Sequence, residues 1–185
     1  MLIPLRLSAQ TDEQLMQRAA RGSDRAFEEL YNRHARRLQG FFVRRLGDDG
    51  DLAADFMHDT FLRLYAAREK YHEGSNFRAW LYTIAYNLCK NHLRNQLTVV
   101  HEDREVSDDS DIEVELDEAI LHDALCDVLK RLPEPHAMLF SLHYEEELTI
   151  PQIAQITNVP EGTVKSRLHK TMNIIKKELK QYENR

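Results

Sequence analysis

The sequence has little of what holds small secreted proteins together. It contains two cysteines, Cys89 and Cys126, too few for a disulfide framework, so a reducing compartment, the cytoplasm, is expected. No apolar run approaches the roughly 18–20 residues that cross a bilayer, and the first ten residues lack a signal-peptide core. Six glycines, five prolines and few alternating β-branched stretches leave a chain rich in Leu, Ala, Glu and Arg. This composition favours an all-α fold.

An acidic run divides the chain. Residues 101–118 hold ten Asp or Glu, one Arg and no aromatic residue, a local charge of −9 within a chain of net charge −6. Such a segment buries too little apolar surface to offset its ordering entropy. We therefore predict two small helical domains, residues 1–97 and 116–185, joined by a flexible acidic linker at residues 98–115.

Apolar residues at helical spacing predict four helices in the first domain. They are expected at residues 11–21, from residue 24 onward, at 52–69 and at 76–95, with a turn at 47–51. The apolar face expected for the second helix comprises Phe27, Leu30, Tyr31, His34, Leu38, Phe41 and Phe42.

The third helix has an unusual outward face. Its predicted inward residues are Ala53, Phe56, Met57, Thr60, Phe61 and Leu64. Outside, Asp55, His58 and Asp59 surround the apolar Leu62. An apolar residue within a charged rim is typical of a protein interface, although a single exposed leucine is also common on ordinary surfaces.

The fourth helix combines aromatic and basic residues. Its predicted core stripe is Phe77, Leu81, Ile84 and Leu88, with Trp80 beside it. The opposite arc is expected to carry Tyr82, Thr83, Tyr86, Asn87, Lys90 and Arg94. Such an arc suits the stacking of unpaired bases, but exposed tyrosines also serve in helix packing and protein interfaces, so both interpretations stay open.

The C-terminal domain contains a predicted helix-turn-helix. A helix at residues 116–131 ends before the prolines of residues 132–135, and another is expected at 136–144. Two further helices flank the turn at residues 157–160. The last helix is expected to bury Val164, Leu168, Thr171 and Ile175 and to expose Gly162, Ser166, His169, Lys170 and Asn173. The preceding helix and turn favour DNA binding over a merely solvated helix. Residues 161–185 have a local charge of +4, so this end of the acidic chain is basic.

Two candidate metal sites are incomplete. The dipeptide His58-Asp59 occurs in metal-dependent phosphohydrolases, but the additional ligands are not evident. Cys89 and His92 lie three residues apart and supply two ligands of the usual four. Neither a glycine-rich phosphate loop nor a nucleophile motif is present. We expect no catalytic residue, metal or cofactor, and a binding protein that is not an enzyme.

Four segments together resemble one family. They are AADFMHDTFLRLY (residues 53–65), FRAWLYTIAYNLCKNHLR (77–94), LPEPHAMLFSLHYEEELTIPQIA (132–154) and VPEGTVKSRLHK (159–170). Their identity and order resemble bacterial RNA polymerase sigma factors of the extracytoplasmic-function type, the compact two-domain branch of the sigma-70 family. Three departures are His58 in place of the common Gln, Ala137 in place of the common Arg of LPxxxR, and Glu147 in place of the frequent Gly.

The resemblance implies a role for each outward face. The third helix would dock on the β′ clamp of core RNA polymerase through Asp55, His58, Asp59 and Leu62. The fourth helix and the loop before it would melt and read the minus-ten promoter element through Tyr71, His72, Ser75, Asn76, Arg78, Trp80, Tyr82, Tyr86, Asn87, Lys90 and Arg94. The last helix would read the minus-thirty-five element through Thr163, Lys165, Ser166, Arg167, His169 and Lys170.

The resemblance also implies partners and leaves rivals. Such a protein binds core polymerase, at the β′ clamp and the β flap, and promoter DNA, and a separate anti-sigma factor usually silences it and can hold it at the membrane. The acidic linker would thread toward the RNA exit path. Two rivals are a stand-alone helix-turn-helix regulator and a metal-dependent phosphohydrolase that uses His58 and Asp59.

Overall fold

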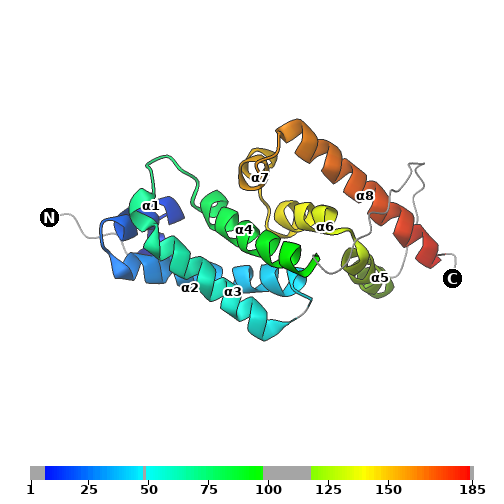
Figure 1. Ribbon diagram of the computed structural model, residues 1–185, viewed down its shortest axis with the longest axis horizontal. Helices are drawn as coiled ribbons and strands as arrows, with labels where there is room; N and C mark the ends of the chain where they lie inside the picture. Colours follow the sequence, from blue (N-terminus) through cyan, green and yellow to red (C-terminus); the bar gives the residue numbers. More distant parts are fainter. Residues whose placement is uncertain (1–6, 48, 98–117, 184–185) are drawn as a thin grey trace. The chain divides into compact units, whose positions relative to one another are not determined.

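The computed structural model describes residues 7–47, 49–97 and 118–183, and within these ranges all regular elements are helical, which confirms the predicted fold class. The described chain forms two compact units, which we treat separately (Figure 1). The first unit lies within residues 7–97, and the second unit lies within residues 118–154 and 158–183. The helices are α1 (Asp12–Ala20), α2 (Asp24–Arg45), α3 (Gly50–Ala66), α4 (Phe77–Leu97), α5 (Glu118–Arg131), α6 (Glu134–Phe140), α7 (Ile150–Thr157) and α8 (Glu161–Glu183). Three single turns, η1 (Leu7–Ala9), η2 (Arg68–Lys70) and η3 (Ser141–Glu145), complete them. The linker predicted at residues 98–115 lies outside the described residues.

Side-chain caps fix the first residues of α1, α3 and α4 in the first unit. Thr11 and Gln14 form a reciprocal capping box at α1. The Asp49 carboxylate accepts the Leu52 amide at 2.9 Å, so α3 begins at Gly50, inside the turn expected at residues 47–51. Asn76 caps α4 in the same way, accepting the Ala79 amide at 2.8 Å.

Helices α2 and α3 pack side by side and contribute Phe41, Phe42 and Phe61 to the aromatic core of the first unit. Of the apolar face predicted for α2, Leu30, Leu38, Phe41 and Phe42 are fully buried, and the other three residues, Phe27, Tyr31 and His34, are half-buried. The predicted inward face of α3 is buried too, except that Phe56 is half-exposed. Each fully buried Leu or Phe side chain contributes about 1.5–3 kcal/mol to this core.

Helix α4 differs from the expectation. Tyr82, predicted on the outer arc, is 2% exposed and meets Phe41 of α2 edge-on, with ring centroids 5.5 Å apart. Ala79, Ala85 and Cys89 are also buried, whereas Ile84 and Leu88 of the predicted stripe are only half-buried. The cause is that α4 packs against α1, α2 and α3, so its buried arc is wider than a single stripe.

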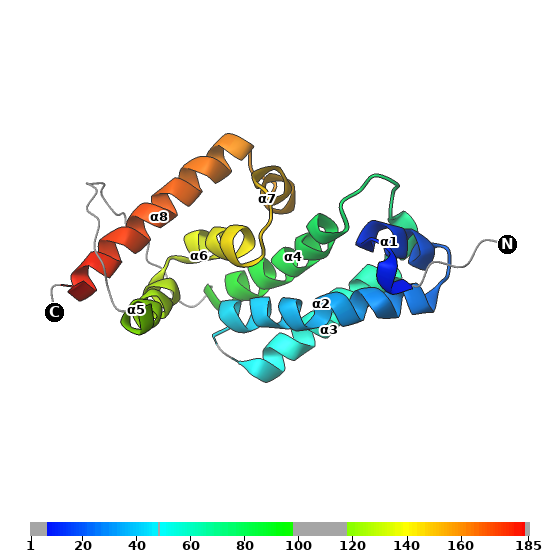
Figure 2. The ribbon, with the colours of Figure 1, turned by 180° about the vertical axis from the view of Figure 1, so that it is seen from behind.

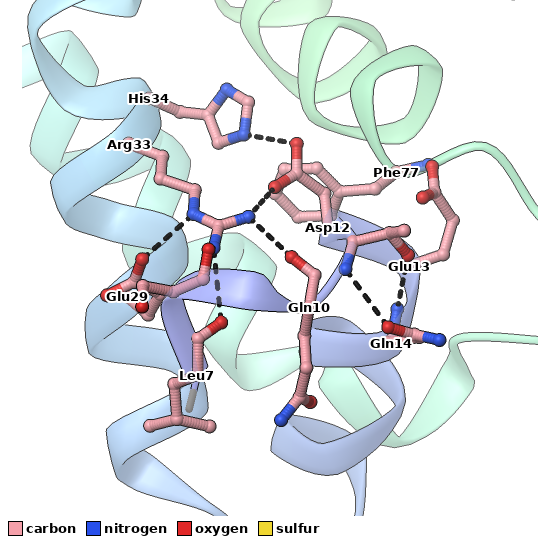
Figure 3. Close-up of polar contacts among 11 residues, drawn as sticks. Leu7, Gln10, Asp12, Glu13, Gln14, Glu29, Arg33, His34 and Phe77 are labelled. Atoms are coloured by element: carbon pink, nitrogen blue, oxygen red, sulfur yellow. Dashed lines mark hydrogen bonds and ion pairs between the residues drawn. The ribbon is translucent and has the colours of Figure 1, made fainter. Parts of the chain in front are cut away.

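A polar cluster fastens the N-terminal turn η1 and helix α1 to α2 (Figure 3). The Arg33 guanidinium donates to the carbonyls of Leu7, Ser8 and Gln10 and to the carboxylates of Asp12 and Glu29. Satisfying the guanidinium donors in this way is possible because their fork is rigid and planar. The cluster therefore sets the position of α1 relative to α2.

In the second unit α8 packs on α5 and α6, as both ribbon views show (Figures 1 and 2). Their common core includes Val128, Leu132, Ala137 and Ile175. Helix α6 begins at Glu134, two residues before the expected start, because Pro133 precedes it and Pro135 lies in its first turn, where no backbone N–H is needed. The expected helix at 136–144 continues past Phe140 as the π turn η3. None of the described helices is long and apolar enough to span a bilayer.

Two non-glycine residues of the second unit adopt a left-handed backbone. Asn158, with φ of 55°, ends α7 and turns the chain toward α8, a position that asparagine tolerates well. Glu147 has φ of 54°, at the position where the family resemblance suggested a frequent glycine. A backbone conformation that favours glycine explains that preference, and this chain adopts it at some cost with glutamate.

Candidate nucleic-acid and protein interfaces

The outer face of α3 has the composition predicted for it. Leu62 is 69% exposed, which is unusual for a large apolar side chain. Asp55 and His58 are exposed beside it, and Asp59 accepts both contacts of the Arg63 guanidinium, at 3.0 and 3.1 Å. The Arg63–Asp59 ion pair is exposed to water, which weakens it. The face therefore keeps its acidic character around the apolar Leu62.

His58 is oriented by α2. Its Nε2 lies 3.2 Å from the Tyr31 hydroxyl, and the two rings are nearly parallel, with an interplanar angle of 7°. The hydroxyl can donate to a neutral imidazole or accept from a protonated one. In either state the contact holds the imidazole at the rim of the Leu62 face.

The loop before α4 is folded around Tyr71. This ring is 9% exposed, stacks on Trp80 with centroids 5.5 Å apart, and its hydroxyl donates to the Ser75 carbonyl. Burial, with the nearby Glu13 and Asp12 carboxylates, raises the pKa of Tyr71 to about 12. The Tyr71 ring is thus a support of the loop, while His72 and Asn76 are exposed on it.

Helix α1 also reaches this loop. The Glu13 carboxylate accepts the backbone N–H of Phe77, the first residue of α4, at 3.4 Å (Figure 3). His34 lies against the Phe77 ring, with centroids 5.2 Å apart, and its Nε2 is 2.6 Å from Asp12. Hydrogen bonds and charges of His34 and Arg33 outweigh burial and lower the pKa of Asp12. Sequence reasoning missed these contacts because they join residues far apart in the chain.

The outer arc of α4 is partly as predicted. Asn87, Lys90 and Arg94 are exposed, and Lys90 approaches the half-buried Tyr86 ring at 5.9 Å from its centroid. Arg78, Trp80 and Ser75 are half-buried. The placement of Tyr82 on this arc is wrong, because its ring lies in the core and cannot stack on a base.

The α8 surface agrees with the helical projection. The four residues expected inside, Val164, Leu168, Thr171 and Ile175, are buried. The residues predicted to contact DNA lie outside: Lys165, Ser166, Arg167, His169 and Lys170 are exposed, and Thr163 is half-buried. The Ser166 hydroxyl donates to the Thr163 carbonyl at 3.1 Å, so its lone pairs remain available as acceptors.

One residue beside α8 was absent from the prediction. His136 of α6 lies with Nδ1 2.8 Å from the Thr171 hydroxyl, which in turn donates to the Arg167 carbonyl at 2.8 Å. Burial, together with the charges of Lys170 and Arg167, lowers the pKa of His136. No local sequence pattern marks this position, since the contact spans 35 residues.

The candidate metal sites find no further ligands. Within the described ranges no group of three or more His, Cys, Asp or Glu side chains could hold a metal ion. His58 contacts Tyr31, and Cys89 is fully buried, while His92 packs edge-on against Phe56 at 5.2 Å between centroids. The phosphohydrolase alternative therefore lacks a metal site in this part of the chain.

Comparison with known proteins gives matches to both units. The family model for sigma-70 region 2 matches residues 30–97, and that for sigma-70 region 4 matches residues 122–173. The chain is 33% identical to the RNA polymerase sigma factor CarQ of Myxococcus xanthus, over 84% of this chain and 90% of that protein. It is 32% identical to the sigma-H factor of Pseudomonas aeruginosa, over 94% and 96%, and 31% identical to the ECF sigma-E factor of Escherichia coli, over 89% and 92%.

Solved structures share the fold. The chain resembles CnrH, solved in complex with the cytosolic domain of CnrY, with a TM-score of 0.68, 21% identity and coverage of 92% of this chain and 97% of that one. It also resembles the sigma factor RpoE of Bartonella quintana, solved with the anti-sigma factor NepR, with a TM-score of 0.64, 23% identity and coverage of 83% and 96%. The similarity thus extends over both helical units.

Proposed function

The chain belongs to the extracytoplasmic-function type of the sigma-70 family of RNA polymerase sigma factors, and we propose that it binds core RNA polymerase and directs initiation at its own set of promoters. One observation carries this proposal. Both family regions occur in this one chain, in the order that the family has them, and each carries its own exposed face. In this role the chain supplies binding energy for promoter recognition, and the polymerase performs the chemistry.

The α3 face is the proposed dock for the β′ clamp. Leu62 would enter an apolar depression as the anchor, while Asp55 and Asp59 would face basic groups of the clamp and speed association. Tyr31 would contribute indirectly by fixing His58 at the rim. The β flap would take the second unit.

The α4 surface and the loop before it are the proposed minus-ten contact. Exposed His72 and Asn76 on the loop, with Ser75, would line the place where a flipped base is read. Lys90 and Arg94 would hold the backbone of the opened strand, and Asn87 would reach a base edge. The remaining candidates are half-buried and would act at the edge of this surface: Arg78, Trp80 and Tyr86.

Helix α8 is the proposed minus-thirty-five reader. Exposed Lys165, Arg167 and Lys170 can neutralise phosphates or reach guanines in the major groove, while Ser166 and His169 offer shorter polar groups. Thr163 lies at the start of the helix, where phosphate contacts are favoured. Each surface alone would bind weakly, and holding both units on one promoter raises the effective concentration of the second contact.

An anti-sigma factor is the proposed regulator. Its support is the family and the structural relative RpoE, which was solved with the anti-sigma factor NepR. A regulator that covers the Leu62 face would compete directly with core polymerase. If that regulator is membrane-anchored, it would hold this protein at the membrane until its release.

The test is transcription in vitro with the purified full chain, purified core polymerase and a genomic DNA library. We expect transcripts that begin at a limited set of sites, and alignment of those sites should yield two conserved elements at a fixed spacing. DNA binding without core, and no start sites with it, would instead support the stand-alone regulator. If this protein, purified without bound metal, still directs initiation by core polymerase, the phosphohydrolase alternative is removed.

A further inference from the structure

His136 lies beneath the basic surface of the second unit. Its Nδ1 is 2.8 Å from the Thr171 hydroxyl, and Thr171 is fully buried on the inner face of α8. Because the hydroxyl hydrogen is donated to the Arg167 carbonyl, Thr171 can only accept from His136, so Nδ1 carries a hydrogen. This leaves Nε2 as the atom that takes up a second proton, and protonation there keeps the hydrogen bond to α8.

The surroundings of His136 disfavour that second proton in the free protein. Arg167 and Lys170 of α8 are the cations whose charges act on it. The nearest acid on its own helix is Glu134, two residues away. On η3, His143 Nδ1 contacts the Leu148 carbonyl, and the Glu145 carboxylate accepts a hydrogen bond from the Ser141 hydroxyl. The neighbouring residue, Ala137, offers no charge. At neutral pH the imidazole is therefore neutral, since burial and both cations lower its pKa.

Contact of α8 with DNA opposes the electrostatic part of this balance. Phosphates that pair with Arg167 and Lys170 bring negative charge to the two cations that act on His136 and offset their repulsion. We propose that His136 binds a proton more readily when α8 lies on promoter DNA and, once protonated, adds a positive charge to those of Arg167 and Lys170, so that acid strengthens the minus-thirty-five contact. The proposal rests on the assignment of α8 as the duplex reader, and it makes His136 a positioning residue that acts through the helix.

The sign of the effect follows from proton linkage. If the DNA-bound state holds more protons than the free state, affinity rises as pH falls through the interval between the two pKa values of His136. Folding of the free protein has the opposite sign, because the unfolded chain protonates this imidazole more readily than the folded one. Acid should thus destabilise the free second unit while it strengthens its hold on DNA, a combination that a purely structural histidine does not produce.

The experiment compares wild-type holoenzyme with His136→Asn holoenzyme on a promoter duplex between about pH 6 and pH 8, the range in which histidine titrates. Asparagine places an N–H near the position of Nδ1 and retains the bond to Thr171, but it cannot titrate. We expect the ratio of wild-type to variant affinity to grow roughly three- to tenfold toward acid, since one proton changes affinity at most tenfold per pH unit. Polymerase groups that titrate cancel in this ratio.

His169 is the obvious confounding group, because it is exposed on α8 itself. The comparison is therefore repeated in the His169→Asn background, where the His136 effect should persist. Equal pH slopes for wild type and His136→Asn, in both backgrounds, would overturn the inference while leaving promoter binding intact. Failure of the wild-type holoenzyme to bind any promoter would overturn the proposed function instead. A ring nitrogen signal of His136 that titrates at higher pH with DNA than without it would support the inference directly.

Discussion

Helices α4 and α8 have the same proposed task, contact with promoter DNA, yet their relation to the sequence differs. Helix α8 packs on one side only, against α5 and α6, and its buried and exposed residues follow the helical projection. Helix α4 contacts α1, α2 and α3, and its projection fails at Tyr82. A helix that is covered on one side can be divided into two faces from its sequence, whereas a helix enclosed on several sides cannot.

Substitution of Tyr82, the α4 residue that is buried against expectation, should have the largest effect, and that effect is on the stability of the first unit. Tyr82→Ala should lower the free energy of unfolding by about 3–5 kcal/mol, because it leaves a cavity beside Phe41 in the core. Denaturant unfolding of the full chain measures this change. Asn87→Ala, on the exposed side of the same helix, is the matched control and should leave unfolding within about 0.5 kcal/mol of wild type. A loss of minus-ten binding by Tyr82→Ala with unchanged stability would restore Tyr82 to the DNA surface.

The Arg33 cluster holds η1 and α1 against α2, and removing it should have the next largest effect. Arg33→Ala should destabilise the first unit by about 2–3 kcal/mol, since a charged donor group with several partners is lost at once. Arg33→Lys keeps the charge but not the fork, and should recover only part of this loss. Thermal unfolding checks both. Arg36→Ala, an exposed arginine one turn away on α2, is the control and should change little.

On α8, by contrast, substitution of an exposed residue should change binding and leave folding unaffected. Lys170→Ala should weaken minus-thirty-five binding by about 1–3 kcal/mol if the ammonium reads a base, and the preferred sequence should then change. A phosphate contact gives another outcome: equal weakening on all sequences and a salt slope reduced by about one. Holoenzyme binding to promoter variants at several salt concentrations separates the two. If Lys170→Ala also made unfolding less cooperative, Lys170 would belong to the packed side of α8 and not to its exposed side.

The sequence predicts the buried and exposed residues correctly for helices that are covered on one side. The outward residues of α3 and the buried residues of α8 were predictable because the period of 3.6 residues assigns each to a side. His136 was not, because its importance depends on Thr171, which the sequence does not connect to it. Likewise, the Tyr31–His58 contact and the bond from Phe77 to Glu13 depend on how helices pack. Sequence patterns identify which surface of a helix is free, and tertiary contacts decide how its residues are oriented and charged.

A smaller effect is expected at the polymerase dock. Leu62→Ala should weaken core binding by about 1–2 kcal/mol, as for an interface anchor of moderate size. Tyr144→Ala is the matched control, because Tyr144 is also a large apolar residue with an exposed side chain and lies in the second unit. Addition of Asp55→Ala should mainly slow association and reduce its dependence on salt. Core affinity unchanged by Leu62→Ala would remove the α3 face from the proposed dock.

The smallest effects concern acid, and they distinguish the two units by pH window. The folded-state pKa of Asp12 is lowered, so its contribution to stability is full above the unfolded value of 3.8 and is lost as pH falls through the folded pKa. The pKa of His136 is also lowered, from 6.5, so the second unit should lose stability at a higher pH, as the unfolded chain takes up this proton first. Unfolding of the free full chain across this range should therefore show two separate losses. His136→Asn should remove the one that begins near pH 6.5, and Asp12→Asn the one below pH 3.8. Removal of both losses by either variant alone would mean that the two units do not respond to acid independently.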